Sequence, residues 1–294
     1  MKLIGCIFVG NEKLMVKYAM PYIIDYGYDK LYIYDDSVDG TIDLIKEYNC
    51  PFIEIIDIHG AYGAYGNVGA FEDYRIKKET EMFETLKKEA IETGEDIWLS
   101  FMDFDEVVFG RRYINDGFKM YLWELSISNN VNYFAGKSAQ LVSKYEKCED
   151  LDLALGKQRF VHGFDGMECI SWSCWGSKVS AIKVNDIKYA YFDLGNHCFK
   201  CTMEDGVLPI NANDFGNFFR FHLKFLTKEI YMYKLNFYNG RFGIYSDVET
   251  YEDSYYRKIS TKFPVNLIFY EDFKNHSYQT KSMGYGYIGG LTLV

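Results

Sequence analysis

The sequence has 294 residues, of which 48% are hydrophobic and 18% aromatic, so it can bury a substantial core in one large domain or one domain with an appendage. A net charge of −10 argues against a nucleic-acid-binding protein, which normally carries a basic face. The seven cysteines are odd in number and irregularly spaced, which argues against a complete disulfide framework and favours a reducing compartment.

The N-terminal stretch MKLIGCIFVGNE contains only a short apolar run before Asn11 and Glu12. This run is too short for the apolar region of a signal peptide and far too short to cross a bilayer. Later segments do not reach membrane-spanning length either. We therefore expect a cytoplasmic protein.

The first hundred residues alternate between strand and helix patterns. We expect strands at Leu3–Val9, Lys30–Tyr34, Phe52–Ile58 and Trp98–Met102, and helices at Lys13–Asp25, Thr41–Tyr48 and Glu72–Thr93. In the last helix, the predicted buried stripe is Tyr74, Phe83, Leu86 and Ala90. This alternation predicts an α/β fold with a mostly parallel, doubly wound sheet flanked by helices, in which ligands bind beyond the carboxyl ends of the strands.

Beyond Arg111 the alternation weakens. Short strand-like pieces are expected at Asn132–Ala135, Gln140–Tyr145 and Lys188–Asp193, followed by a helical stretch at Phe218–Asn236. We predict one domain over residues 1–205 and a helical, aromatic C-terminal subdomain over residues 206–294. The aromatic side chains of this subdomain favour packing on the sheet, with an acceptor platform or a membrane-surface patch as the alternative.

The stretch WLSFMDFDE ends a buried apolar run with Asp103, Asp105 and Glu106. If the strand continues, side chains two residues apart share a face, and their Cα atoms lie roughly 6.7 Å apart. Two such carboxylates repel each other unless one is protonated or a cation lies beside them. Oxygen ligands suit Mg²⁺ or Mn²⁺, which can bridge a diphosphate. The alternative is that acidic residues simply end a strand.

The stretch WLSFMDFDE also resembles the W-[IL]-x-F-x-D-x-D-E signature of GT-A-fold glycosyltransferases of the family 2-like and family 92-like groups. The segments VGNE, at Val9–Glu12, and YIYDDSVDGTIDLI, at Tyr32–Ile45, resemble two further landmarks of these families. The resemblance covers about the first 110 residues. It implies an enzyme of polysaccharide biosynthesis that uses Mn²⁺ or Mg²⁺ to transfer a sugar from a UDP- or GDP-linked donor. The implied acceptor is a hydroxyl of a glycan, lipid-linked or glycoprotein substrate, and inversion is favoured. Peripheral association with the inner membrane surface is an alternative to a purely cytoplasmic location.

The resemblance also implies roles for particular residues within the nucleotide-sugar-binding catalytic domain. Nucleotide contacts are implied for Val9, Asn11, Glu12, Asp35 and Asp36. Asp103 is implied at the donor sugar, the ribose or the metal, and Asp105 at the metal, with His197 completing the metal shell and Lys178 at the diphosphate. The general base is Asp165, in a loop, or Glu168, at the head of a short helix. Asp39 is assigned to helix capping, and Arg75 to a surface salt bridge or the diphosphate.

Three alternatives stay open from the sequence. A sugar-nucleotide nucleotidyltransferase shares the sheet and the acidic motif, but VGNEKLM has only one glycine where a triphosphate loop is expected. A non-catalytic glycan-binding protein with the same fold is the second. The third is a structural zinc site, which the spacing of four cysteines beside His197 permits: Cys169, Cys174, Cys198 and Cys201.

Overall fold

The computed structural model of the chain describes residues 1–61, 68–110, 113–143, 145–156, 167–172, 177–192, 200–211, 218–223, 226–227, 229–234 and 285–287. The chain divides into two compact units, each built from two segments. The first unit consists of Met1–Lys137 and Trp175–Arg220, and the second of Ser138–Cys174 and Phe221–Val294. The predicted boundary near residue 205 and the predicted helical character of residues 206–294 remain predictions, because most residues after 234 lie outside the described part.

The first unit is built on four parallel strands. In spatial order they are β3 (Ile53–Asp57), β2 (Lys30–Asp35), β1 (Lys2–Val9) and β4 (Ile97–Ser100). All four agree with the predicted strands to within about two residues. β1 is buried along most of its length, as expected for a strand covered on both faces.

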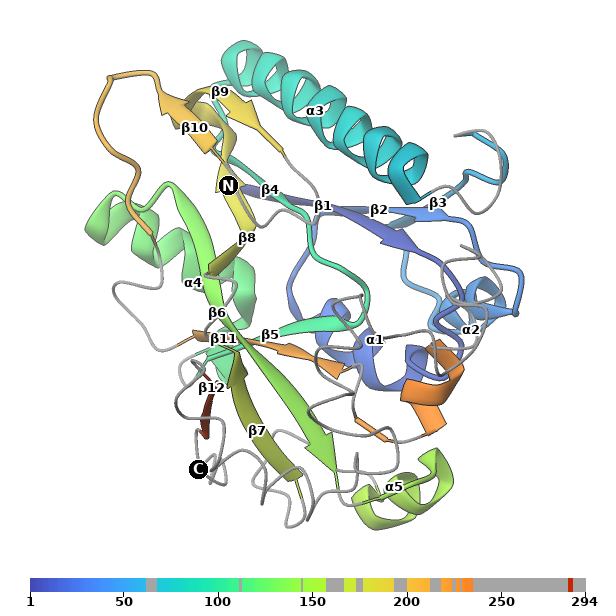
Figure 1. Ribbon diagram of the computed structural model, residues 1–294. Helices are drawn as coiled ribbons and strands as arrows, with labels where there is room; N and C mark the ends of the chain where they lie inside the picture. Colours follow the sequence, from blue (N-terminus) through green and yellow to red (C-terminus); the bar gives the residue numbers. More distant parts are fainter. Residues whose placement is uncertain are drawn as a thin grey trace. The chain divides into compact units, whose positions relative to one another are not determined.

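Three helices connect these strands: α1 (Val16–Asp25), α2 (Thr41–Glu47) and α3 (Val68–Thr93). α3 lies on one face of the sheet, and α1 and α2 lie on the other (Figure 1). Right-handed crossovers require this, because the connection through α3 returns across β1 in the opposite direction to the first two. The predicted α/β class, with a parallel central sheet flanked by helices, is confirmed.

The sheet continues beyond β4 with antiparallel strands. β8 (Ser177–Lys183) pairs with β4, and β6 (Tyr133–Ser143) pairs with β8 through its residues up to Lys137. The remaining elements of the first unit are β5 (Glu106–Gly110), α4 (Tyr113–Asn129), the 3₁₀ turn η1 (Val184–Asp186), β9 (Ile187–Tyr191) and β10 (Lys200–Met203). β9 and β10 form a separate two-stranded sheet.

The core beneath α3 is aromatic and aliphatic. Phe83, Leu86 and Ala90 are buried against the sheet, and Tyr74 is half-buried at its border, as the predicted stripe requires. Phe192 packs edge-on against Phe101, with 5.1 Å between ring centroids. The apolar side of α3 therefore packs this helix against β4, the strand that leads to the acidic motif.

The second unit holds the rest of β6, from Ala139, which pairs antiparallel with β7 (Met167–Trp172). β12 (Tyr285–Tyr287) pairs with the other edge of β7, and α5 (Cys148–Leu155) follows β6. β11 (Phe218–His222) pairs with β5 and straddles the boundary of the two units.

Two sequence predictions after Arg111 are wrong. Phe218–His222 is a strand rather than the start of a helix. Among the described residues of the predicted helical stretch, the α-helical ones are residues 229–234. The aromatic run FFRFH has high strand propensity, and pairing with β5 satisfies its backbone. The two predicted strand pieces near residues 132 and 145 are one continuous strand, β6.

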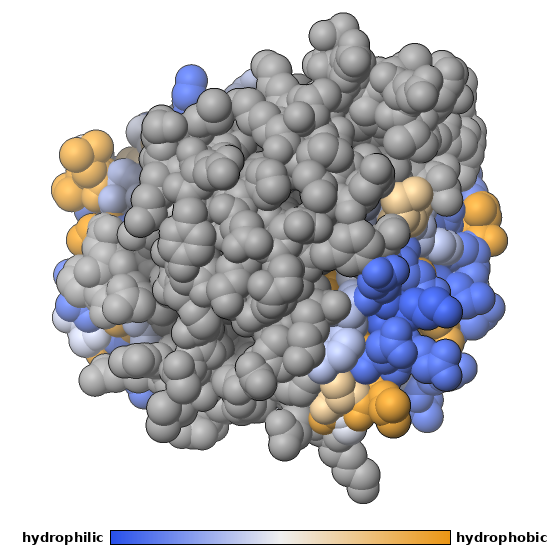
Figure 2. Space-filling view, turned by 60° about the horizontal axis from the view of Figure 1, so that its bottom comes forward, coloured by the Kyte–Doolittle hydropathy of each residue, from blue (hydrophilic) through white to orange (hydrophobic). Residues whose placement is uncertain are grey.

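Within the described residues, no helix is long and apolar enough to cross a membrane. On the face that Figure 2 shows, the coloured surface carries a patch of hydrophilic side chains with a few hydrophobic ones at its border. Isolated apolar side chains at a surface are ordinary and mark no particular site.

Candidate functional site

The strand order creates a switch point at the carboxyl edge of the parallel strands. From β1 the chain moves outward to β2 and then β3, whereas β4 lies on the opposite side of β1. The loops that follow β1 and β4 therefore leave the sheet in diverging directions, and ligands of doubly wound sheets bind in the crevice this creates. Asn11 and Glu12 follow β1, and the acidic motif follows β4.

The loops after β1 and β2 are joined by hydrogen bonds. The Asn11 backbone N–H donates to Ser37 Oγ (3.0 Å), and Asn11 Oδ1 accepts from the Val38 N–H (2.7 Å). The Glu12 N–H donates to Thr41 Oγ1 (2.8 Å). Asn11 adopts a left-handed backbone conformation with φ of 56°, which asparagine tolerates better than most residues. This network gives the two loops one fixed arrangement.

Asp39 caps α2, as predicted. Its Oδ1 accepts hydrogen bonds from the Thr41 N–H (3.0 Å) and the Thr41 hydroxyl, which satisfies the first N–H of the helix. Its Oδ2 accepts from the Lys13 N–H (3.2 Å), so Asp39 also connects the two loops. Gly40, in between, has a positive φ of 88°, a left-handed conformation that glycine adopts without strain.

Val9, Asp35 and Asp57 end three neighbouring strands in register. Asp35 is buried, and its Oδ1 accepts from the Ser37 N–H (2.8 Å). Burial raises the pKa of Asp35, an effect that the hydrogen bonds of Ser37 partly offset. Asp36 is fully buried, and its N–H donates to the Val9 carbonyl (2.9 Å). The structure thus places both carboxylates at the carboxyl edge of the sheet.

The acidic motif forms a turn rather than a strand. β4 ends at Ser100, before the predicted end at Met102, and the Glu106 N–H donates to the Asp103 carbonyl oxygen (3.0 Å). The same-face argument for Asp103 and Asp105, which assumed strand geometry, is therefore wrong. A hydrogen-bonded turn satisfies the backbone where the chain leaves the sheet. It still delivers Asp103, whose side chain is 42% exposed, and the buried Asp105 to the same short loop.

Arg75 is buried inside an acidic cluster rather than exposed in a surface salt bridge. Its guanidinium lies 2.9 Å from Glu72, 4.0 Å from Glu79 and 3.5 Å from Asp103. Burial by itself lowers the pKa of Arg75, but the charges of these carboxylates and of Glu106 outweigh it and raise the pKa. The single positive charge of Arg75, on α3, thus interacts with three carboxylates, one of which is Asp103 of the acidic turn.

Glu106 contacts a second buried arginine. Its Oε1 lies 3.4 Å from Nε of Arg220, which is 2% exposed, and Arg220 Nη1 donates to Ser180 Oγ (3.4 Å). This pair connects β5, β8 and β11. Arg220 is not among the site residues predicted from the sequence, although a signal is present: it is a single arginine at the centre of the aromatic run FFRFH.

The donor set of the acidic turn suits a hard divalent cation. Asp103 and Asp105 provide carboxylate oxygens, the ligands that Mg²⁺ and Mn²⁺ prefer. Among the described residues, no group of three or more histidine, cysteine or acidic side chains is arranged to hold a metal ion. Two carboxylates plus a diphosphate and water satisfy Mg²⁺, which is normally bound through only one or two protein carboxylates.

Several predicted site residues lie elsewhere. His197 and Asp165 lie outside the described residues, as do Cys174 and Cys198 of the predicted zinc alternative. Lys178 lies in β8 opposite Gly136. Glu168 lies in β7 opposite Val142, so its predicted place at the head of a helix is wrong. The alternating segment MECISW, with isoleucine and tryptophan, favours a strand edge-paired with β6.

Comparison with known proteins gives similarity in solved structures only. No protein-family model matches the sequence, and no curated protein matches it. A structure of S. aureus TarS 1-349 is 11% identical, with 94% of this chain and 79% of that chain covered and a TM-score of 0.37. The mannosyltransferase PcManGT from Pyrobaculum calidifontis, in complex with GDP-Man and Mn²⁺, is 12% identical over 96% of this chain and 76% of that chain, with a TM-score of 0.35. Similarity at this level says nothing about the reaction of the present chain.

Proposed function

We propose that the chain is a metal-dependent glycosyltransferase of the GT-A type. It would move a sugar from a UDP- or GDP-linked donor to a hydroxyl of a glycan or glycoconjugate. The observation that supports this most is the placement of the Asp103–Glu106 turn directly after β4, beside the switch point where β1 also ends. Carboxylates at this edge suit a metal–diphosphate ligand.

The donor nucleotide would lie against the fixed loops after β1 and β2. Val9, Asn11 and Glu12 line the first loop, and Asp35 and Asp36 begin the second. Carboxylates accept hydrogen bonds from ribose hydroxyls and from base N–H groups. Because the backbone of both loops is already hydrogen-bonded, binding would require little ordering of the chain there.

Asp103 and Asp105 would hold Mn²⁺ or Mg²⁺, with His197 and Lys178 as further candidates for the metal and the diphosphate. A bound divalent cation supplies charge neutralisation to a departing diphosphate. Arg75 would hold the Asp103 carboxylate through its 3.5 Å contact. For an inverting reaction, Asp165 or Glu168 would take the proton of the acceptor hydroxyl.

Calorimetric titration of UDP and GDP, each with and without Mn²⁺, tests the proposal. We expect one of the two nucleotides to bind only when Mn²⁺ is present. Asp105→Asn should weaken this binding by on the order of tenfold or more, because it removes a charged metal ligand. Asp105→Ala should also abolish sugar transfer and leave the fold intact. Asp57→Asn is the matched control, since Asp57 ends a strand at the same edge but has an exposed side chain.

The proposal fails if neither nucleotide binds, if Mn²⁺ has no effect on affinity, or if Asp105→Asn and Asp57→Asn behave alike. A full transfer rate in Asp105→Ala would equally exclude the assigned role of the acidic turn.

A further inference from the structure

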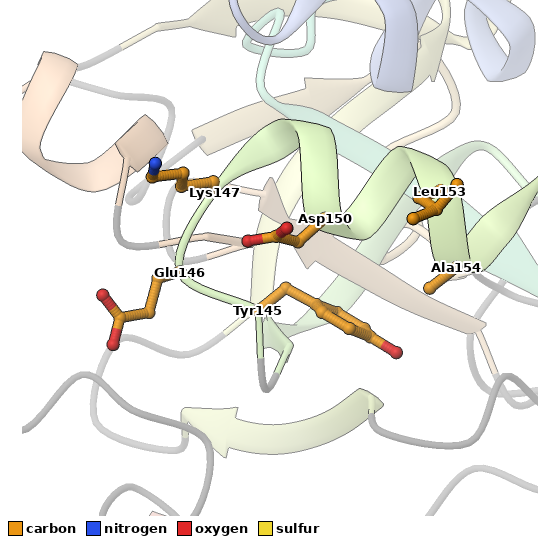
Figure 3. A pocket seen from close by; sticks show the side chains of 6 residues that line it. All are labelled: Tyr145, Glu146, Lys147, Asp150, Leu153 and Ala154. Carbon is orange, nitrogen blue, oxygen red and sulfur yellow. The ribbon is translucent and has the colours of Figure 1, made fainter.

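The second unit contains an open surface pocket of about 510 Å³ at the start of α5 (Figure 3), called the cavity below, whose lining side chains are mostly exposed to solvent. Its lining comes from the segment before α5 and the helix itself: Tyr145, Glu146, Lys147, Asp150, Leu153 and Ala154. None of these residues belongs to the acidic turn or to the loops after β1 and β2. The cavity is thus separate in sequence from the site proposed above.

Two hydrogen bonds to Glu229 hold the segment at the start of α5. The Cys148 N–H donates to Glu229 Oε2 (2.8 Å), and the Glu229 N–H donates to the Glu146 carbonyl oxygen (2.9 Å). On the other side of α5, Leu151 and Leu155 are buried. The start of α5 is therefore fixed in position, and a ligand would meet a preformed surface rather than one it has to order.

The chemical groups of the lining are those that a sugar ring needs. In Figure 3 the Tyr145 ring lies below the axis of α5, and the carboxylates of Asp150 and Glu146 lie to one side of it. A pyranose ring has an apolar C–H face that packs on an aromatic ring, and its hydroxyls donate to carboxylates. Ala154 adds little bulk to the lining, so a ring can approach α5 there.

The charges of the lining select against other ligands. Two carboxylates and one ammonium group leave a net negative lining, which disfavours phosphates and other anions. A purely apolar ligand would strip water from three charged groups without replacing their hydrogen bonds. For a metal ion, the lining residues that the structure describes offer two carboxylates, and Lys147 repels the ion. A neutral molecule with several hydroxyls fits best.

We propose that this cavity binds a pyranose ring of a neutral glycan. Its use as the acceptor-binding site rests on the proposed glycosyltransferase function, whereas saccharide binding itself does not. The carboxylates of Glu146 and Asp150 are exposed to solvent, so the affinity for one ring is weak, and affinity rises as further rings of a chain make contact.

Saturation-transfer NMR on the full chain, without nucleotide or metal, tests this proposal. The probes are methyl glycosides of glucose, galactose, mannose and N-acetylglucosamine, together with maltose and cellobiose. We expect at least one probe to receive saturation on its ring protons. Asp150→Asn and Tyr145→Ala should each weaken its binding by about tenfold or more, and Tyr145→Phe should preserve it because the ring face remains.

Tyr189→Ala removes an exposed tyrosine of the first unit and should leave saccharide binding unchanged. Asp150→Asn changes an exposed side chain, so its effect reports binding even if Tyr145→Ala unfolds the chain. The proposal is overturned if no probe binds, or if binding survives both Asp150→Asn and Tyr145→Ala in folded protein. Saccharide binding without Mn²⁺-dependent nucleotide binding would refute the transferase function while leaving this site intact.

Discussion

Arg75 shows how a single buried charge organises the candidate site. Its guanidinium contacts Glu72, Glu79 and Asp103, so α3 and the acidic turn depend on the same cation. Removal of one partner from a buried ion pair leaves uncompensated charge in a poorly solvated place, which costs far more than loss of a surface pair. Arg75 is therefore a positioning residue for Asp103 in addition to its structural role.

We expect Arg75→Met to lower the free energy of unfolding at neutral pH by about 3–5 kcal/mol. The loss should shrink in acid, where the carboxylates become protonated and no longer repel one another. Arg75→Lys should lose less of the free energy of unfolding than Arg75→Met, since the charge remains but the planar donor geometry is lost. Urea denaturation at pH 7 and pH 4 measures all three values.

The control for this prediction is Lys77→Met, on the same helix. Lys77 is mostly exposed and lies 3.9 Å from Glu81, a surface pair worth less than about 1 kcal/mol. Equal effects of Arg75→Met and Lys77→Met would show that the Arg75 cluster carries no special stability.

Asp35 and Asp57 occupy the same register at the carboxyl edge but have opposite pKa shifts. Burial raises the pKa of Asp35. The pKa of Asp57 is lowered instead, mainly because its carboxylate accepts a hydrogen bond from the His59 backbone N–H. A carboxyl group with a raised native pKa binds its proton more tightly when folded. Stability then falls as pH rises from the unfolded pKa to the native one. For Asp57 the sign is reversed, and stability falls as pH drops through its native pKa.

We therefore expect Asp35→Asn to stabilise the chain at pH 7, since asparagine keeps an acceptor for the Ser37 N–H without a buried charge. The gain should vanish at pH 3, where Asp35 is protonated. Asp57→Asn should instead destabilise the chain at pH 7, because it removes the charged acceptor of the His59 N–H. Urea titrations of both variants at the two pH values provide the measurement, and a shared sign at pH 7 would contradict the assigned causes.

At the scale of elements, the side chains of Leu31 and Tyr28 fill the space beside Gly5 of β1. A Cβ atom on Gly5 would lie 2.5 Å from Leu31 Cδ1 and 2.8 Å from Tyr28 Cε1, both in buried side chains. Tyr28 is also held by a 3.0 Å hydrogen bond between its hydroxyl and Ser100 Oγ. The absence of a side chain at Gly5 thus lets Tyr28 reach across to β4.

We expect Gly5→Ala to destabilise the chain by about 1–3 kcal/mol through overpacking. Leu31→Val removes bulk beside the new methyl group, so the double variant should lose less than the sum of the two single losses. Thermal and urea denaturation of the four proteins complete a double-mutant cycle. Strict additivity would show that Leu31 is not the residue that the new methyl group displaces.

The elements up to β4 were predicted well because each carries its own periodic pattern. Predicted and observed bounds agree for the first four strands, and for α3 the buried stripe is correct. The errors occur where long-range pairing decides the structure. FFRFH becomes β11 because β5 lies beside it, and MECISW becomes β7 because β6 pairs with it. The aromatic and β-branched residues of these segments favour a strand, but the local pattern does not specify the partner strand that stabilises it.

The candidate site, like the fold, could be predicted from the sequence only in part. The place of the acidic motif after a predicted buried strand, together with the family resemblance, predicts Asp103 and Asp105 as site residues. Only the structure shows that they lie on a turn and that Arg75 is buried against Asp103. Arg75 was expected at a surface because most arginines lie there. Its burial depends on the packing of α3 over the sheet, which the sequence does not specify residue by residue.

At the scale of the whole molecule, two discontinuous units carry two separate candidate sites. The carboxyl edge with its acidic turn lies in the first unit, and the cavity at α5 lies in the second. A ligand slows hydrogen exchange where it stabilises local structure against opening. The two ligand classes should therefore leave different exchange patterns on the same chain.

We expect the nucleotide that binds with Mn²⁺ to slow amide exchange in residues 9–13, 35–41 and 101–106, because these segments form the loops after β1, β2 and β4. Exchange in residues 145–155 should stay unchanged with nucleotide and slow with the bound saccharide. Deuterium uptake measured by mass spectrometry with each ligand separates the two responses. If the nucleotide slowed exchange only in residues 145–155, the donor would bind in the second unit, and its proposed place in the first unit would be wrong. Uniform slowing throughout the chain would instead indicate global stabilisation, with neither site located as proposed.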